Sequence, residues 1–347
     1  METARTGPAA EVHAIPDRIK ETTVDTRQLG TTDLHITPIG FGAWAIGGPD
    51  YAFGWGPQDD ADSVAAVHRA LDVGINWIDT APVYGLGRSE RVVARALKSA
   101  GSSRRPYVFT KCSLVWDQPG TISHSLKAAS VRKELEDSLR RLETDVIDLY
   151  QIHWSKPWGL EAPAPDIEEG WSALAALQKE GKVRHIAVSN FDVAEMERLR
   201  PIAPIASLQP PYSMLRRGVE GEILPYCLTN RIGVIVYSPM AAGILSGAMT
   251  RERAAALPAN DWRSKNPDYQ EPRLSRNLAL VEELRRIGAR HGAPPGAVAI
   301  AWTLRQPAVT GAIVGFRSPK QVEGLLAAAT LRLAPEDIAG IDALTAF

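Results

Sequence analysis

The sequence predicts a (β/α)₈ TIM barrel. Eight short apolar segments, typical of strands buried on both faces, alternate with helical patterns along the chain. No change of composition separates a second domain, and 347 residues are an ordinary length for one such barrel. A doubly wound open sheet is the competing topology, because hydrophobic periodicity alone does not distinguish the two.

The first part of the chain is expected to differ from the rest. Residues 1–25 contain few periodic apolar residues and are predicted to form a flexible tail, which leaves 26–347 for the barrel. The segments TRQLG and LHITPIG then flank a turn over residues 30–33, which predicts an N-terminal β-hairpin.

The strands are predicted from their apolar runs. They are Ile39–Phe41, Ile75–Asp79, Tyr107–Thr110, Val146–Ile152, Val183–Val188, Ile205–Leu208, Ile232–Tyr237 and Thr310–Val314. After the seventh strand, Met249–Glu271 contains two prolines, with a third, Pro272, directly after it, and predicts a long βα loop, a kind of loop that is often functional.

Helices are predicted between the strands from residues that recur on one face. One helix is expected to begin at Asp62, with Val64, Val67 and Leu71 on its apolar side. Another places Val131, Leu135, Leu139 and Leu142 at helical spacing. A third is expected to begin with a capping box of Asp192 and Glu195.

Composition excludes several kinds of protein. The net charge of −1 gives no reason to expect nucleic acid or an anionic membrane as a partner. Two cysteines, Cys112 and Cys227, are too few for a disulfide framework or a four-cysteine zinc site, and no metal is predicted. Without an apolar signal segment or an uncharged run of 18 residues, we expect a soluble cytoplasmic protein.

Four ionisable residues follow the predicted strands at the end where barrel enzymes carry their chemistry. Asp79 ends the second strand and Tyr84 lies in the loop after it, Lys111 ends the third strand, and His153 ends the fourth.

A tyrosine hydroxyl transfers protons poorly at neutral pH, and a nearby ammonium is expected to lower its pKa. A carboxylate would in turn compensate the buried ammonium. We therefore assign Tyr84 as the acid, with Lys111 tuning it, Asp79 holding Lys111, and His153 donating to the substrate oxygen. The alternative is that Asp79 and Lys111 form a buried ion pair with only a structural role.

The segments IDTAPVYGLGRSE, VFTKC, DVIDLYQIHW, IAVSNF, LQPPYSML, VYSPMAAGIL and GFRSPKQVE resemble the aldo-keto reductase superfamily. The resemblance covers the chain from Thr26 onward and is strongest to a bacterial branch related to general stress reductases. It implies the same four catalytic residues and NADPH as the cofactor. It also implies a monomer that acts on a small-molecule carbonyl substrate.

The resemblance also implies positions for the cofactor. Ser189, Asn190 and Gln209 would bind the nicotinamide carboxamide, and Tyr237 would stack on its ring. The first βα loop, at Ala43 and Trp44, would border the cofactor. The pyrophosphate would lie along Ser238, Met240, Ala242 and Gly243. The adenosine 2′-phosphate end would lie at Gly315, Phe316, Arg317, Ser318 and Gln321.

The last of these positions is also supported by local sequence. Ser318-Pro319-Lys320-Gln321 has the pattern of a capping box with proline at the first helical position. A helix N-terminus beside Arg317 suits a phosphate, which favours NADPH over NADH.

Eight of the nine tryptophans divide into two groups. Trp77, Trp171 and Trp302 lie within strand or helix patterns and are expected to be structural. Five follow strand ends and are predicted on the active face: Trp44, Trp55, Trp116, Trp154 and Trp158. The first four of these are assigned to a pocket for an apolar or planar carbonyl substrate, with plain loop packing as the alternative.

The sequence thus predicts an NADPH-dependent aldehyde or ketone reductase. Two alternatives remain open. One is a lyase that forms a Schiff base at Lys111, although Asp79 would keep that amine protonated. The other is a regulatory protein of this fold that binds NADPH without turnover.

Overall fold

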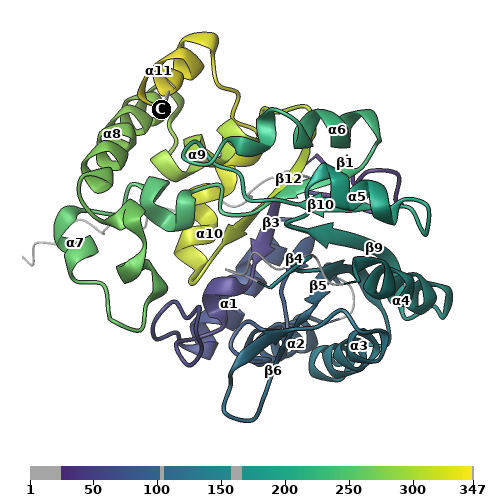
Figure 1. The fold of residues 1–347 in the computed structure, drawn as a ribbon. Coiled ribbons are helices and arrows are strands. Elements are labelled where there is room, and N and C mark those ends of the chain that lie inside the picture. The colour runs from purple at the N-terminus through teal and green to yellow at the C-terminus, as the bar shows by residue number, and fades with distance from the viewer. Residues whose placement is uncertain (1–24, 102–104, 158–165, 346–347) are drawn as a thin grey trace, which may run out of the picture.

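The computed structural model describes residues 25–101, 105–157 and 166–345, and its centre is a closed barrel of eight parallel strands (Figure 1). Residues 1–24 of the predicted tail, and Trp158, lie outside the described residues. The barrel strands are β3 (Ile39–Gly42), β4 (Trp77–Asp79), β5 (Tyr107–Cys112), β8 (Ile147–Ile152), β9 (Val183–Ser189), β10 (Ser207–Gln209), β11 (Gly233–Val236) and β12 (Val309–Gly315). They follow one another in chain order, and β12 pairs with β3. The predicted barrel is confirmed and the doubly wound alternative is wrong.

Alternation along the strands separates the barrel interior from the layer beneath the helices. Trp77, Phe109 and Leu149 point inward and form one apolar cluster, whereas Tyr150 belongs to the larger core between strands and helices. Gly40 makes room for this packing, because a Cβ at that position would lie 2.2 Å from the Trp77 ring.

The predicted N-terminal hairpin is present as β1 (Arg27–Gln28) paired with β2 (His35–Ile36). Its apolar side chains Leu29, Leu34 and Ile36 join the cluster inside the barrel. The hairpin therefore closes one end of the barrel, and the functional loops gather at the other. A second hairpin, β6 (Leu114–Trp116) with β7 (Ile122–His124), follows β5.

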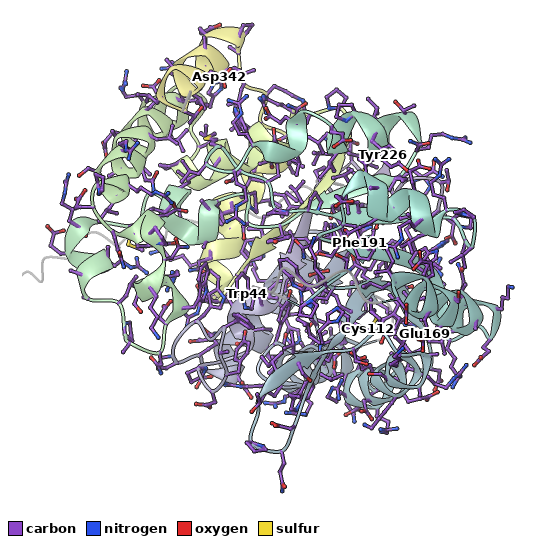
Figure 2. The ribbon with its side chains drawn as sticks, in the orientation of Figure 1. Trp44, Cys112, Glu169, Phe191, Tyr226 and Asp342 are labelled. Atoms are coloured by element: carbon purple, nitrogen blue, oxygen red, sulfur yellow. The ribbon has the colours of Figure 1, made fainter. Side chains whose placement is uncertain are left out.

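Helices surround the barrel (Figure 1). They are α1 (Asp60–Asp72), α2 (Arg88–Ala100), α3 (Ala128–Leu142), α4 (Ile167–Lys179), α5 (Val193–Leu199), α6 (Ile223–Thr229), α7 (Arg251–Ala255), α8 (Arg273–His291), α9 (Pro295–Leu304), α10 (Pro319–Leu325) and α11 (Pro335–Thr345). Figure 2 shows Trp44 near the middle of the molecule in this view, with Tyr226 on α6 and Asp342 on α11 toward its outer edge. None of the helices in the described part of the chain is long and apolar enough to cross a membrane.

Most helix predictions hold in detail. Val131, Leu135, Leu139 and Leu142 are all buried on α3. The capping box of Asp192 and Glu195 is formed at the start of α5, because each side chain accepts a hydrogen bond from the other's backbone N–H. One boundary was wrong: α1 begins at Asp60, since Asp59 accepts hydrogen bonds from the N–H groups of Ala61 and Asp62 and ends the preceding loop.

The predicted long loop after β11 is partly ordered into helical turns. The 3₁₀ turn η4 (Ala241–Ser246) follows β11 directly, and α7, η5 (Trp262–Lys265) and η6 (Pro267–Tyr269) lie within 249–271. The loop contacts the first βα loop at two backbone positions, a bridge between Trp55 and Asp261 and a hydrogen bond of 3.2 Å from Trp262 N to Gly54 O.

Candidate active site

Asp79 and Lys111 meet inside the barrel rim. Both continue the inward alternation of their strands, Asp79 two residues after Trp77 and Lys111 two residues after Phe109. The Lys111 ammonium lies 2.6 Å from Asp79 Oδ1 and donates a second hydrogen bond of 2.9 Å to the carbonyl of Thr80. The Lys111 side chain is fully buried, and the pair therefore compensates a charge that would be costly to bury alone.

The second oxygen of Asp79 is held by two amides. Gln209 Nε2 donates to Asp79 Oδ2 over 2.8 Å, and Gln151 Nε2 donates to the same atom over 3.2 Å. Gln151 was not predicted, although alternation indicates it: Leu149, Gln151 and His153 occupy every second position of one stretch. The carboxylate thus has hydrogen bonds on both oxygens.

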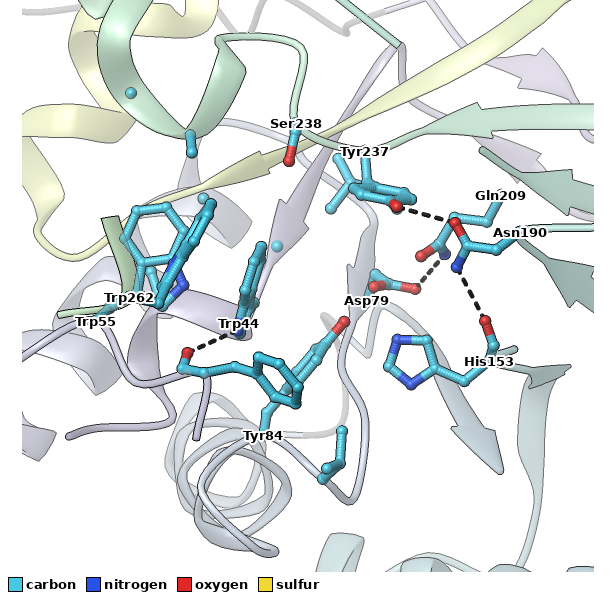
Figure 3. A pocket seen from close by; sticks show the side chains of 18 of the residues that line it. Trp44, Trp55, Asp79, Tyr84, His153, Asn190, Gln209, Tyr237, Ser238 and Trp262 are labelled. Atoms are coloured by element: carbon cyan, nitrogen blue, oxygen red, sulfur yellow. Dashed lines mark hydrogen bonds between the residues drawn. The ribbon is translucent and has the colours of Figure 1, made fainter. Parts of the chain in front are cut away.

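Tyr84 and His153 complete the group. Tyr84 Oη lies 3.5 Å from Lys111 Nζ. The rings of Tyr84 and His153 meet edge to face, with centroids 5.7 Å apart and an interplanar angle of 80°. Figure 3 shows both rings facing the same space, with Asp79 behind them. The structure therefore brings together all four residues predicted from the strand ends.

The pKa of Tyr84 differs from the expectation. Burial raises the pKa of the Tyr84 hydroxyl well above its usual value, and the negative charge of Asp79 raises it further. The Lys111 ammonium 3.5 Å away does not reverse this rise, because it is paired with Asp79. The hydroxyl accordingly keeps its proton at neutral pH and can act as a donor.

His153 is held as a neutral imidazole. Burial lowers the pKa of His153 well below its usual value, and the Lys111 ammonium lowers it further. A neutral ring has one N–H to donate and one nitrogen to accept. Tyr84 and His153 can thus present two neutral donors to one oxygen atom.

A cavity of about 310 Å³ opens above these residues. Its wall includes Asp79, Tyr84 and His153, and also many of the positions that the sequence analysis assigned to the cofactor and the pocket: Trp44, Trp55, Trp154, Asn190, Gln209, Tyr237, Ser238, Met240, Ala242, Gly243 and Gly315. Lys111 does not line the cavity.

Other predicted positions lie outside this wall. Ala43, Ser189 and Phe316 are buried beneath it, where Ser189 Oγ donates to the carbonyl of Gln209. The assignment of Trp116 to the pocket is wrong, because Trp116 lies on the β6–β7 hairpin, where the Arg141 guanidinium covers its ring at 5.8 Å. Trp116 does follow the end of β5, as the sequence indicated, but the chain forms the β6–β7 hairpin there, and Trp116 belongs to that hairpin and not to the cavity wall.

One side of the cavity is a fixed polar wall. The Tyr237 hydroxyl donates to Asn190 Oδ1 over 2.9 Å, and Asn190 Nδ2 donates to the carbonyl of His153 over 3.0 Å (Figure 3). Asn190 has a φ of +60°, in the left-handed region that asparagine tolerates better than most residues. The Asn190 side chain therefore connects Tyr237 to the backbone of His153, directly after β8.

The rim after β11 has unusual backbone. Ser238, Ala241 and Ala242 all have positive φ, which is uncommon outside glycine and is often found at functional sites. Space is left at Gly243 and Gly315, where a Cβ would find its nearest neighbour at 3.9 Å. A ligand could approach the backbone closely at both glycines.

Arg317 does not lie free beside a helix end. Its guanidinium donates to Gln58 Oε1 over 2.6 Å, to Trp55 O over 3.3 Å and to Pro57 O. The predicted capping box is also wrong: α10 begins at Pro319, but the Ser318 side chain makes no capping bond, and Gln321 Oε1 accepts from the Arg317 N–H instead.

Several residues of the site were missed by sequence reasoning. Trp262 stacks on Trp44 with centroids 5.4 Å apart, and Trp55 meets both rings edge on (Figure 3). Arg216 and Asn266 also line the cavity. Trp262 and Asn266 come from the long loop after β11, whose path depends on distant contacts; the prediction of a functional loop over 249–271 and the tryptophan excess were the available signals.

Comparisons with known proteins agree with this geometry. The family model described as "Aldo/keto reductase family" matches residues 38–346. Aldo-keto reductase YhdN of Bacillus subtilis is 38% identical over 298 residues, 86% of each chain. The NADH-specific methylglyoxal reductase of Escherichia coli is 34% identical and covers 89% of this chain and 94% of its own. The glycerol dehydrogenase AKR11B4 of Gluconobacter oxydans superimposes with a TM-score of 0.81 at 36% identity, over 94% of this chain and 96% of its own.

Proposed function

Since the chain belongs to the aldo/keto reductase family, we propose that it reduces an aldehyde or ketone to the alcohol, with NADPH as the hydride donor. The observation that carries this proposal is the convergence of Tyr84 and His153 on one cavity above the buried Lys111–Asp79 pair.

The chain's own residues would handle the substrate oxygen. Tyr84 and the neutral His153 ring donate hydrogen bonds to the carbonyl oxygen, which polarises the carbonyl. Tyr84 then transfers its proton to that oxygen as negative charge develops there. Lys111, 3.5 Å from the hydroxyl, stabilises the phenolate that remains, and Asp79 holds Lys111 in place.

The cavity fits a reduced nicotinamide, which when bound supplies the hydride to the carbonyl carbon. Tyr237 offers a ring face, and Asn190 and Gln209 offer amide groups beside it. The open backbone at Gly243 and Gly315 leaves room for the phosphate-bearing part.

The preference for NADPH is supported by charge at the rim. Arg317 donates only to neutral oxygens, and it forms no ion pair within the described part of the chain. Burial lowers the pKa of Arg317, and the positive charges of Arg263 and Arg253 lower it further, while the negative charge of Asp261 opposes them. This excess of cations suits the 2′-phosphate that distinguishes NADPH from NADH.

The alternative of a Schiff-base lyase is disfavoured. The Lys111 ammonium is fully buried, does not line the cavity, and donates to Asp79 and to the carbonyl of Thr80. A carbonyl carbon in the cavity therefore has no path to this amine.

The proposal is tested by Tyr84→Phe, which removes only the proton donor. We expect turnover of aldehydes to fall by at least about 100-fold, because general acid catalysis contributes on that scale. Binding of NADPH, measured by quenching of tryptophan fluorescence, should change little. Wild-type kcat in the variant would contradict the assignment of Tyr84, and a parent protein that oxidises NADPH with no aldehyde, ketone, quinone or sugar would contradict the function itself.

A further inference from the structure

Arg216 is a cation at the cavity wall that the proposed reaction does not use. It is exposed and lines the cavity. Its backbone is fixed by a tight turn, in which Ser213 and Arg216 exchange hydrogen bonds of 3.2 and 3.0 Å between their main chains. The guanidinium itself makes no hydrogen bond or ion pair with any residue that the structure describes.

The neighbouring arginine is different. Arg217 pairs with Glu220 over 3.0 Å and with Asp342 over 2.7 Å, and it covers the ring of Trp302. Its role in packing the end of the barrel is therefore explained by its contacts. No contact within the described ranges of the chain explains Arg216 in that way.

The charges of the cavity wall leave Arg216 uncompensated. Of the charged or titrating groups that line the cavity, Asp79 is neutralised by Lys111 and His153 is neutral. Among the residues that the structure describes, no second carboxylate lines the wall. This described wall above Tyr84 therefore carries one net positive charge, which attracts an anion and disfavours a cation.

The location of Arg216 places this charge near the reacting end of the cavity. Burial raises the pKa of the Tyr237 hydroxyl to about 12, and the Arg216 guanidinium opposes that rise, so its charge acts at the hydroxyl. That hydroxyl donates to Asn190, which in turn donates to the carbonyl of His153. The cations assigned to the cofactor phosphate have other neighbours. Arg317 donates to Gln58 of the first βα loop, and Arg263, in the loop after β11, lies over the ring of Trp55.

We propose that Arg216 binds an anionic group of the carbonyl substrate, so that the enzyme prefers aldehydes or ketones carrying a carboxylate or a similar small oxyanion. The proposal rests on the reductase function argued above. A guanidinium recognises a carboxylate through two parallel hydrogen bonds, and the rigid turn at Ser213 reduces the entropy lost on binding.

The test compares 4-carboxybenzaldehyde with its methyl ester, in which one methyl group removes the negative charge. The parent enzyme should show a higher kcat/KM for the carboxylate. Arg216→Gln should lower kcat/KM for the carboxylate by about 10- to 100-fold, the scale of a hydrogen bond to a charged group, and should change that for the ester less than about threefold. Arg91→Gln on α2, which makes the same charge change away from the cavity, serves as the control.

The outcomes separate the inference from the function on which it rests. If the parent reduces both aldehydes and Arg216→Gln lowers kcat/KM for both equally, or weakens NADPH binding in a fluorescence titration, Arg216 does not recognise the substrate anion and the reductase function stands. If the parent reduces neither aldehyde nor any other carbonyl in a broad panel, the reductase function fails and the inference falls with it.

Discussion

Arg317 shows how one residue can have two roles at the rim. Its guanidinium joins three oxygen atoms of the first βα loop, at Trp55, Pro57 and Gln58. None of these oxygens carries a full charge, so the positive charge of Arg317 stays available to a phosphate at the same position. The side chain thus orders the loop, and under the proposed function it also contributes to the electrostatic field around the cofactor.

Arg317→Ala should weaken NADPH binding by about tenfold or more and weaken NADH binding much less, because only NADPH carries the 2′-phosphate. The Kd values of both cofactors, measured by fluorescence titration, check this. Arg317→Lys retains the charge but not the three hydrogen bonds to the loop, and it should recover part of the preference. Equal loss for both cofactors in Arg317→Ala would show that Arg317 acts only through the loop.

At the scale of elements, the first βα loop and the loop after β11 form one collar around the cavity. Trp55 and Trp262 pack against Trp44, and the Arg263 guanidinium lies 4.7 Å from the Trp55 ring centroid. Arg263 is held by Asp261, which is only 2% exposed. Asp261 accepts hydrogen bonds from two groups of the guanidinium, from Nε at 2.9 and 3.2 Å and from Nη2 at 2.5 Å. The two loops are therefore expected to open together.

Asp261→Asn should loosen both loops, because the amide cannot accept both of the guanidinium's hydrogen bonds. We expect faster amide hydrogen exchange in residues 51–59 and in 249–271, with the barrel strands unchanged. Mass spectrometry of exchanged peptides checks this. Faster exchange confined to 249–271 would mean that the collar is not one cooperative unit.

At the scale of the whole molecule, Glu134 couples the helix layer to the barrel. It lies on α3, is 7% exposed, and accepts hydrogen bonds from the Ser113 N–H and the Ser130 hydroxyl. Burial raises the pKa of Glu134 to about 8 from 4.5, and the hydrogen bonds from Ser130 and Ser113 limit the rise. Between pH 4.5 and about 8, the folded protein therefore keeps a proton on Glu134 that the unfolded chain has released.

This proton makes stability depend on pH. Because the folded state binds more protons between pH 4.5 and about 8, the contribution of Glu134 to the free energy of unfolding falls as pH rises through that window. Glu134→Gln should remove this slope and stabilise the protein at pH 8 by on the order of a few kcal/mol. Urea unfolding at several pH values checks this, with the exposed Glu222→Gln as control. A slope unchanged in Glu134→Gln would assign it to other groups.

The strands and the four central residues could be predicted from the sequence because they depend on local rules. Apolar runs marked the strands, and Asp79, Lys111 and His153 stood at the ends of three neighbouring strands. Parallel pairing then brought these residues to one rim. A short strand in a closed barrel has little freedom to place its end elsewhere.

Tertiary structure alone decided the rest of the site. Trp262 and Asn266 reach the cavity through a loop held by Gly54 and Trp55, about two hundred residues earlier. Arg317 binds the same early loop rather than the solvent, and burial sets the pKa of Tyr84 above its usual value instead of below it. Local patterns specify which residues an element presents, but the partners of a loop side chain and its exclusion from water are set by segments distant in sequence.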